Sequence, residues 1–255
     1  MDTITLTGGN KLCFLSFGEE NRGHGKTVIF VHGAGANSET WRRTAEKLEH
    51  QHWILALDMP GHGRSIGFGS SSIEGYADQV EDLLDQLGEK EAVVVGNSMG
   101  GGIALQIALN CPEKLWGIGL VGTGARLRVL PDIFESIKAD FPGAVKKIAG
   151  FALYSQDESE AAVLMERELG RGDPQVIYND FLACNRFDVM ERVDHIQLPA
   201  LVVCGRQDRL TPLKYAEYLA QQIPRATLQV IEECGHVSMV EHPERLAEIL
   251  EEFLA

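Results

Sequence analysis

The sequence is poor in basic residues and has no long apolar run. It contains 23 Lys and Arg against 37 Asp and Glu, which gives a formal net charge of −14 over 255 residues. An acidic surface lacks the basic stripe that nucleic-acid binding requires and disfavours adsorption to anionic membranes. No apolar segment is long enough to cross a bilayer. We therefore expect neither nucleic acid nor a membrane among its partners.

Paired cysteines are also missing. The five cysteines have no C-x-x-C spacing; they are Cys13, Cys111, Cys184, Cys204 and Cys234. Isolated thiols in odd number are typical of reduced, packed cysteines in a cytoplasmic protein, and their spacing does not suit a metal site. The first residues, MDTITLTGG, show neither the charged nor the apolar segment of a secretory signal. These features favour a cytoplasmic protein without a metal.

What the sequence does contain is an alternation of short apolar runs with amphipathic segments. After a hairpin predicted over 3–17, buried strands are predicted at 27–31, 52–57, 93–95, 115–121, 200–204 and 227–231. Helices follow most of them, with Ser38, Ser71 and Thr211 as predicted N-caps, and a last helix is predicted over 243–254. This alternation predicts an α/β fold with a doubly wound, mostly parallel sheet covered by helices on both faces.

Between 125 and 198 the alternation stops. Four helix-like stretches follow one another, at 131–140, 142–153, 158–169 and 174–185, the third beginning at Glu158. We expect a helical lid (cap) insertion over the carboxyl edge of the sheet, because one crossover should not need four helices. Longer crossover helices packed on a sheet face are the alternative. The predicted domains are a core formed by 1–124 and 199–255 and a lid formed by 125–198.

One stretch, AVVVGNSMGGGIA at 92–104, carries the chemistry. It runs from a buried strand through a tight turn into a buried helix, with Ser98 at the apex. G-x-S-x-G at such a turn is the nucleophile elbow, in which glycines at 96 and 100 make room for a strained serine backbone. A glycine-rich turn of any doubly wound protein is the alternative. The stretch has neither the Lys-Ser/Thr of a P-loop nor G-x-G-x-x-G spacing, which argues against a nucleotide loop.

Further polar residues follow other predicted strands. They are the segment 32–35, Asp208 and His236, and with Ser98 they run in the order Ser, Asp, His. Side chains beyond the carboxyl ends of parallel strands meet at one edge of the sheet. A serine hydroxyl needs an adjacent base, and a histidine base needs a carboxylate to fix its tautomer. The order is that of an elbow-type hydrolase rather than of the two protease families with the same chemistry.

With these motifs the chain resembles α/β-hydrolase-fold enzymes over nearly its whole length. The matching segments are HGAGAN at 32–37, DMPGHGRS at 58–65, GNSMGG at 96–101, GRQDRLTP at 205–212 and GHVSMVEHPE at 235–244. The resemblance implies that Ser98 is the nucleophile, His236 the general base and Asp208 its orienting acid. It also implies an oxyanion hole made by the backbone N–H groups of Ala34 and Met99.

Several polar residues have structural interpretations. Asp208 can instead cap the helix that begins near Thr211, and Asp58 resembles a turn-forming aspartate of the family. The resemblance also implies that His32 holds the oxyanion loop through a hydrogen bond. We expect His62 and His242 to be solvated. Thr123, where some relatives would place the acid, is not acidic.

The predicted function is that of a serine hydrolase, a carboxylesterase without metal or organic cofactor. A serine at 98 excludes the subclasses of this fold that use an aspartate nucleophile. Its substrate is expected to be a small to medium ester that binds in an apolar pocket under the lid. The protein is expected to be a monomer or a homodimer. Candidate pocket residues are Phe134, Ile137, Phe141, Phe151, Leu153, Tyr154, Leu164, Met165, Phe181 and Met190.

Other activities stay open. A carbon–carbon bond hydrolase of ring-cleavage products, a thioesterase and a lactonase use the same residues, and the first would want an arginine near the nucleophile. The sequence shows no obvious pair of basic residues that would bind an anionic group of a substrate, although Arg126, Arg128 and Arg186 are available. A non-catalytic ligand-binding member of the fold is the alternative from another class.

Overall fold

The computed structural model describes residues 2–154 and 159–255, and its centre is an eight-stranded sheet within those residues. The strand order is β1-β2-β4-β3-β5-β6-β7-β8. The strands are β1 (Asp2–Thr5), β2 (Lys11–Phe17), β3 (Thr27–Val31), β4 (Trp53–Asp58), β5 (Ala92–Asn97), β6 (Leu115–Val121), β7 (Ala200–Gly205) and β8 (Ala226–Ile231). The β1–β2 and β2–β4 pairs are antiparallel and the other pairs parallel. Met1 and the predicted helix start at Glu158 lie outside the described residues.

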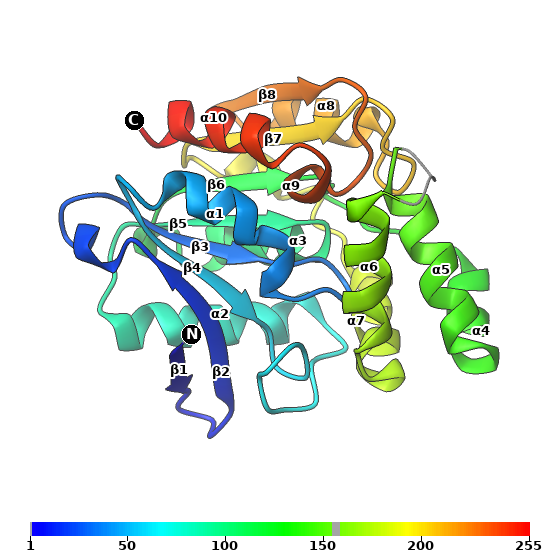
Figure 1. Cartoon of the computed structure of the whole chain (residues 1–255). Coiled ribbons are helices and arrows are strands. Elements are labelled where there is room, and N and C mark those ends of the chain that lie inside the picture. Colours follow the sequence, from blue (N-terminus) through cyan, green and yellow to red (C-terminus); the bar gives the residue numbers. More distant parts are fainter. Residues whose placement is uncertain (1, 155–158) are drawn as a thin grey trace.

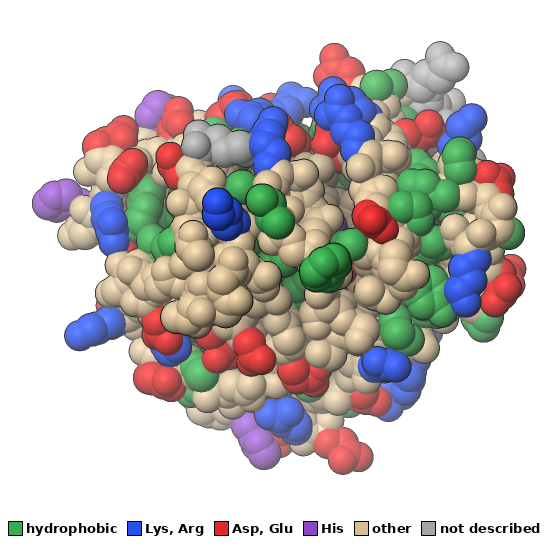
Figure 2. All heavy atoms as spheres, turned by 90° about the horizontal axis from the view of Figure 1, so that it is seen from below, with side chains coloured by type: hydrophobic (Ala, Val, Ile, Leu, Met, Phe, Trp, Pro, Cys, Tyr) green, Lys and Arg blue, Asp and Glu red, His purple; other side chains and the backbone are tan. Residues whose placement is uncertain are grey.

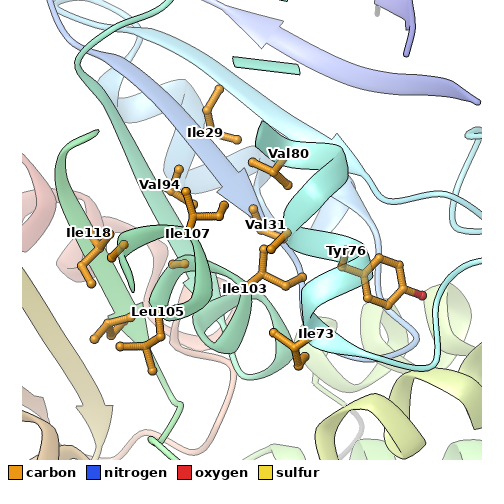
Figure 3. Packing of buried hydrophobic residues seen from close by; sticks show 14 of the residues in the cluster. Ile29, Val31, Ile73, Tyr76, Val80, Val94, Ile103, Leu105, Ile107 and Ile118 are labelled. Atoms are coloured by element: carbon orange, nitrogen blue, oxygen red, sulfur yellow. The ribbon is translucent and has the colours of Figure 1, made fainter. Parts of the chain in front are cut away.

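Helices cover both faces of this sheet (Figure 1). The helices are α1 (Arg42–Leu48), α2 (Ile73–Leu87), α3 (Met99–Asn110), α8 (Leu213–Gln222), α9 (Ser238–Glu241) and α10 (Pro243–Leu254). Alternate residues of a strand point to opposite faces, so Ile29 and Val31 pack with α2 and α3, whereas Val28 and Phe30 pack with α1 and α10. Figure 3 shows the first of these layers.

The remaining helices lie in the chain between β6 and β7. They are α4 (Pro131–Ala139), α5 (Phe141–Ala152), α6 (Glu160–Gly170) and α7 (Pro174–Arg186). They stand together beside the edge of the sheet toward which β3, β5 and β6 point (Figure 1). Figure 2 shows acidic and basic side chains interspersed over one face of the molecule, with hydrophobic side chains gathered toward this helical side. In the described part of the chain, no helix combines the length and apolar character needed to cross a membrane.

The predicted N-caps were wrong by one residue or more. Asn37, rather than Ser38, accepts a hydrogen bond from the Glu39 N–H at 3.0 Å, and a 3₁₀ turn (Ser38–Trp41) precedes α1. Ser72, rather than Ser71, caps α2 by accepting from the Gly75 N–H at 3.2 Å. Ser71 and Ser72 are consecutive and have the same capping chemistry, so only the backbone conformation determines which of them caps α2.

Candidate active site

The turn between β5 and α3 is strained at Ser98. The serine has φ 53° and ψ −111°, a backbone conformation that side chains rarely adopt. A Cβ at Gly96 would collide with the backbone of Gly100, and a Cβ at Gly100 would collide with the carbonyl of Val31. Thr123 supports the turn, because its Oγ1 donates to the Ser98 carbonyl at 2.7 Å. The packing therefore accounts for both glycines of G-x-S-x-G.

Asp208 and His236 meet beyond the ends of β7 and β8. Nδ1 of His236 lies 2.9 Å from Oδ2 of Asp208, and both residues are buried, each with an exposed fraction of 5%. Burial alone would raise the pKa of Asp208, but His236 and hydrogen bonds from Thr211 hold that pKa below its usual value. An ionised carboxylate at this position favours a proton on Nδ1 and leaves Nε2 as the basic nitrogen.

Asp208 also caps the turn that precedes α8. Its Oδ1 accepts from the backbone N–H groups of Leu210 and Thr211, each at 2.8 Å. Thr211, predicted as a helix cap, instead donates its hydroxyl to Oδ2 of Asp208 at 2.8 Å and lies 3.1 Å from Nδ1 of His236. The two interpretations of Asp208 are thus compatible, because different oxygens serve the turn and the histidine.

Asn97 was not predicted to have a role in the site. Its Nδ2 donates to the carbonyl of Val121 at 3.2 Å and to the carbonyl of His236 at 3.0 Å. It therefore ties the histidine loop to the turn that carries Ser98. Its place inside the G-x-S-x-G segment was the only signal in the sequence, and that segment does not specify the chemistry of this position.

The loop after β3 is held by a neutral histidine. Nδ1 of His32 donates to the Gly33 carbonyl at 2.8 Å, while Nε2 accepts from the Met59 N–H at 3.1 Å. Burial and the neighbouring His62 lower the pKa of His32 to about 4. The ring is therefore uncharged near neutral pH, with its proton on the nitrogen that binds the loop.

Two backbone N–H groups beside Ser98 have no acceptor among the described residues. The amides of Ala34 and Met99 make no hydrogen bond to another described residue. The loop passes directly against the serine, since a Cβ built at Gly33 would lie 3.4 Å from the Cβ of Ser98. In the described part of the chain Ser98 Oγ also makes no hydrogen bond. Catalytic hydrogen bonds often become short only in the complex with substrate.

A cavity of about 390 Å³ brings these groups together. Gly33, Ala34, Ser98 and His236 all lie in its wall. Of the predicted pocket residues, Phe151, Met165 and Phe181 line it. The other predicted residues do not: they are Phe134, Ile137, Phe141, Leu153, Tyr154, Leu164 and Met190. Apolar residues that were not predicted also line the cavity, among them Leu127, Val129, Leu130, Ile133, Ile148 and Leu169.

Basic side chains also reach this cavity. Arg126, Arg128, Arg209 and Lys214 are in its wall. The three arginines are engaged elsewhere: Nη2 of Arg126 lies 2.6 Å from the carboxylate of Asp188, Arg128 donates to the Asn185 carbonyl at 2.9 Å, and Arg209 donates to the Leu153 carbonyl at 2.8 Å. Arg186, the third arginine considered from the sequence, is not part of the wall and donates to a backbone carbonyl at 3.4 Å.

The expectation that His62 is solvated was wrong. This histidine is buried, with an exposed fraction of 3%, and its Nε2 lies 2.7 Å from Oδ2 of Asp180 on α7. Asp58 forms its turn as expected, accepting from the N–H groups of Ser38 at 2.8 Å and Arg64 at 2.9 Å. His242 is also hydrogen-bonded, 3.0 Å from a backbone carbonyl.

The five cysteines are free thiols, and all but Cys111 are buried. Burial raises the pKa of Cys204 to about 12 and raises that of Cys234 as well. A thiol with a raised pKa is a poor nucleophile, which agrees with a packing role.

The model of the Alpha/beta hydrolase family matches residues 28–249. The chain belongs to this family. A pimeloyl-[acyl-carrier protein] methyl ester esterase of Aliivibrio fischeri is 26% identical over 250 residues, covering 92% of the chain and 96% of the relative. A 2-hydroxy-6-oxononadienedioate/2-hydroxy-6-oxononatrienedioate hydrolase of Paraburkholderia phymatum is 32% identical over 256 residues, covering 91% and 88%.

Solved structures agree with this membership. A thermophilic esterase is 34% identical with a TM-score of 0.86, covering 99% of this chain and 96% of that one. The enol-lactonase of Burkholderia xenovorans has a TM-score of 0.91 at 21% identity, with 99% of each chain covered, and this likeness concerns the fold alone. The relatives support a hydrolase.

Proposed function

We propose that this protein is a serine hydrolase that cleaves carboxylic esters of small to medium size through an acyl-enzyme at Ser98. The observation that carries the proposal is the wall of one cavity, which contains Ser98, His236 and Ala34 together with a mostly apolar lining. The strained backbone at Ser98 and the buried partner of His236 support it, since strain and fixed tautomers cluster at sites of catalysis.

In the proposed reaction His236 acts twice. Nε2 takes the proton of Ser98 Oγ while that oxygen attacks the carbonyl carbon of the ester. The charge on the carbonyl oxygen is met by the N–H groups of Ala34 and Met99, and losing one such donor costs about 3–4 kcal/mol of barrier. The imidazolium, stabilised by Asp208, then gives its proton to the departing alcohol. Water attacks the acyl-enzyme by the same route in reverse.

We infer further that 125–198 acts as a lid that shapes the pocket. Its helices and the segment before them supply most of the apolar lining, including Leu127, Ile133, Ile148 and Met165. Where the wall is apolar, it favours acyl or alcohol groups by their size and hydrophobicity rather than by hydrogen bonding.

A second candidate is the hydrolysis of carbon–carbon bonds in ring-cleavage products. Two observations favour it: Arg126 and Arg128 line the cavity, and the 2-hydroxy-6-oxononadienedioate/2-hydroxy-6-oxononatrienedioate hydrolase of Paraburkholderia phymatum is 32% identical. The ester hydrolase stays the first proposal because Arg126 is held by Asp188 and would have to leave that ion pair to bind a substrate anion.

The test is an activity screen with Ser98→Ala as the control. p-Nitrophenyl esters of increasing chain length, thioesters, lactones and ring-cleavage dienones are compared by kcat/KM. The proposal expects turnover of esters that the Ser98→Ala variant lacks. Preferential turnover of dienones would favour the second candidate, and ester turnover that survives in Ser98→Ala would contradict both.

A further inference from the structure

A buried carboxylate on α7 joins segments that are far apart in the chain. Asp180 is fully buried, and its Oδ2 accepts the Gly35 N–H at 2.8 Å and lies 2.7 Å from Nε2 of His62. Its Oδ1 accepts the hydroxyl of Tyr76 at 2.5 Å. Tyr76 belongs to α2, and its hydroxyl points out of the apolar cluster in Figure 3. One side chain of α7 thus contacts the loop after β3, the loop after β4 and α2.

His62 supplies the charge that this carboxylate needs. Both ring nitrogens face acceptors, with Nδ1 3.2 Å from the Pro60 carbonyl and Nε2 against Asp180. Burial alone would lower the pKa of His62, but Asp180 and the hydrogen bonds raise it above its ordinary value. A protonated His62 makes a buried ion pair with Asp180, and a buried carboxylate left without such a partner is strongly destabilising.

The two peptide groups that flank Ala34 are held from different sides. The peptide between Gly33 and Ala34 has its carbonyl bound by Nδ1 of His32, and the N–H at its other end is the proposed oxyanion donor. The next peptide, between Ala34 and Gly35, has its N–H bound by Asp180. Fixing both peptides fixes the backbone torsions of Ala34 and hence the direction of its N–H.

The same loop is fastened at its other end by α6. Glu168, with an exposed fraction of 4%, accepts from Nδ2 of Asn37 at 2.8 Å. A Cβ at Gly35, where φ is +70°, would lie 2.8 Å from the side chain of Leu169 and 3.2 Å from that of Ile177. The segment 33–37 therefore lies directly under α6 and α7 and is bound by a carboxylate from each.

We propose that Asp180 is a positioning residue of the oxyanion hole, which holds the Gly35 N–H so that the Ala34 N–H stays aimed at the substrate carbonyl. Asp180 does not line the cavity, so it acts through the loop and not by touching substrate. Catalysis then requires that α7 contacts the loop after β3, in addition to any part that α7 has in the wall of the pocket. The inference rests on the proposed function, because it needs Ala34 to be an oxyanion donor.

The test is Asp180→Asn, assayed with p-nitrophenyl butyrate and with 1-butaneboronic acid, which forms a tetrahedral adduct at an active serine. The amide oxygen can take the place of Oδ2 and Nδ2 then faces the Tyr76 hydroxyl, so the substitution keeps the shape of the side chain but removes the negative charge that holds the Gly35 N–H and His62. We expect kcat to fall about 10- to 100-fold with KM little changed, because a misaimed donor weakens the transition state more than substrate binding. The inhibition constant of the boronic acid should weaken by a similar factor.

Two further variants complete the experiment. Asp173→Asn makes the same change at the exposed N-cap of the same helix, where Asp and Asn cap equally well, and should leave kcat and melting temperature unchanged. His62→Gln keeps a donor for Asp180 but removes the charge, and should lower kcat and boronic-acid affinity in the same direction. If Asp180→Asn does not fold, His62→Gln decides the question by these two readouts.

The outcomes separate this inference from the proposed function. A folded Asp180→Asn, or failing that His62→Gln, with kcat and boronic-acid affinity within about twofold of the wild type would overturn the inference. A loss confined to KM would overturn it as well. Wild-type protein that does not turn over the ester, or turns it over without Ser98, would contradict the proposed function instead.

Discussion

Replacing Asp208 with asparagine should nearly abolish catalysis while leaving the fold intact. Asp208 accepts hydrogen bonds from two backbone N–H groups at Oδ1 and from Thr211 and His236 at Oδ2. An asparagine has only one accepting oxygen, which would stay with the two N–H groups. Its Nδ2 would then donate toward His236 Nδ1 and the Thr211 hydroxyl oxygen, so His236 would carry its proton on Nε2.

A histidine with its proton on Nε2 cannot take the proton of Ser98. The corresponding change in a Ser-His-Asp enzyme lowers kcat by about 10⁴-fold, and we expect a loss of that order here. The melting temperature should change little, because the two amide hydrogens meet two acceptors. The assay is the initial rate with p-nitrophenyl butyrate beside thermal unfolding followed by circular dichroism.

The control is Asp194→Asn, which makes the same change in an exposed Asp–His pair, where Asp194 lies 3.8 Å from His195. It should keep wild-type activity. An Asp208→Asn variant that retains kcat/KM within about tenfold of the wild type would refute the role given to Asp208. A loss of activity that came with unfolding of the variant would refute it equally.

Three other changes test separate parts of the account. Ser98→Gly should remove activity yet raise the free energy of unfolding by about 1 kcal/mol, measured by urea titration, because glycine tolerates the positive φ at this turn. Met165→Trp narrows the apolar cavity, so kcat/KM should fall more for octanoate than for acetate esters; an unchanged profile would exclude Met165 from the substrate path. The folded-state pKa of His62 is raised above its ordinary value of 6.5, so its contribution to stability is complete below that pH and is lost as pH rises through the higher folded value. Urea titrations across this window should show a decline with pH that the Asp180→Asn variant lacks, and equal slopes would contradict the assigned charge.

The sheet could be predicted because each parallel strand is a short run of apolar residues that is buried on both faces of the sheet. The predicted strand at 115–121 and the helix at 243–254 have the same bounds in the structure as β6 and α10. Ser98 could be singled out as the candidate nucleophile because a strained strand-to-helix turn requires glycine at fixed positions. Asp208 and His236 could be singled out as its candidate partners because strand ends share one edge of the sheet.

The contacts of the α4–α7 segment could not be predicted in the same way. His62 and Asp180 are 118 residues apart, and nothing near either residue indicates the other. The prediction of the pocket-lining residues was mostly wrong for a related reason. The apolar residues of an amphipathic helix can face either the cavity or a neighbouring helix, and the sequence does not distinguish the two. Phe134, for example, packs edge-to-face against Tyr178 with ring centroids 5.2 Å apart instead of lining the cavity.

The most direct test of the central claim, that Ser98 is an activated nucleophile, is labelling with a fluorophosphonate probe followed by mass spectrometry of the digested protein. The account predicts one adduct per chain, located on the peptide that contains Ser98. Labelling should disappear in Ser98→Ala and after denaturation of the wild type, since the proposed activation needs His236 and the two N–H donors in their folded positions. A folded wild-type protein that takes up no probe at Ser98 would contradict the claim and favour a ligand-binding role for this cavity.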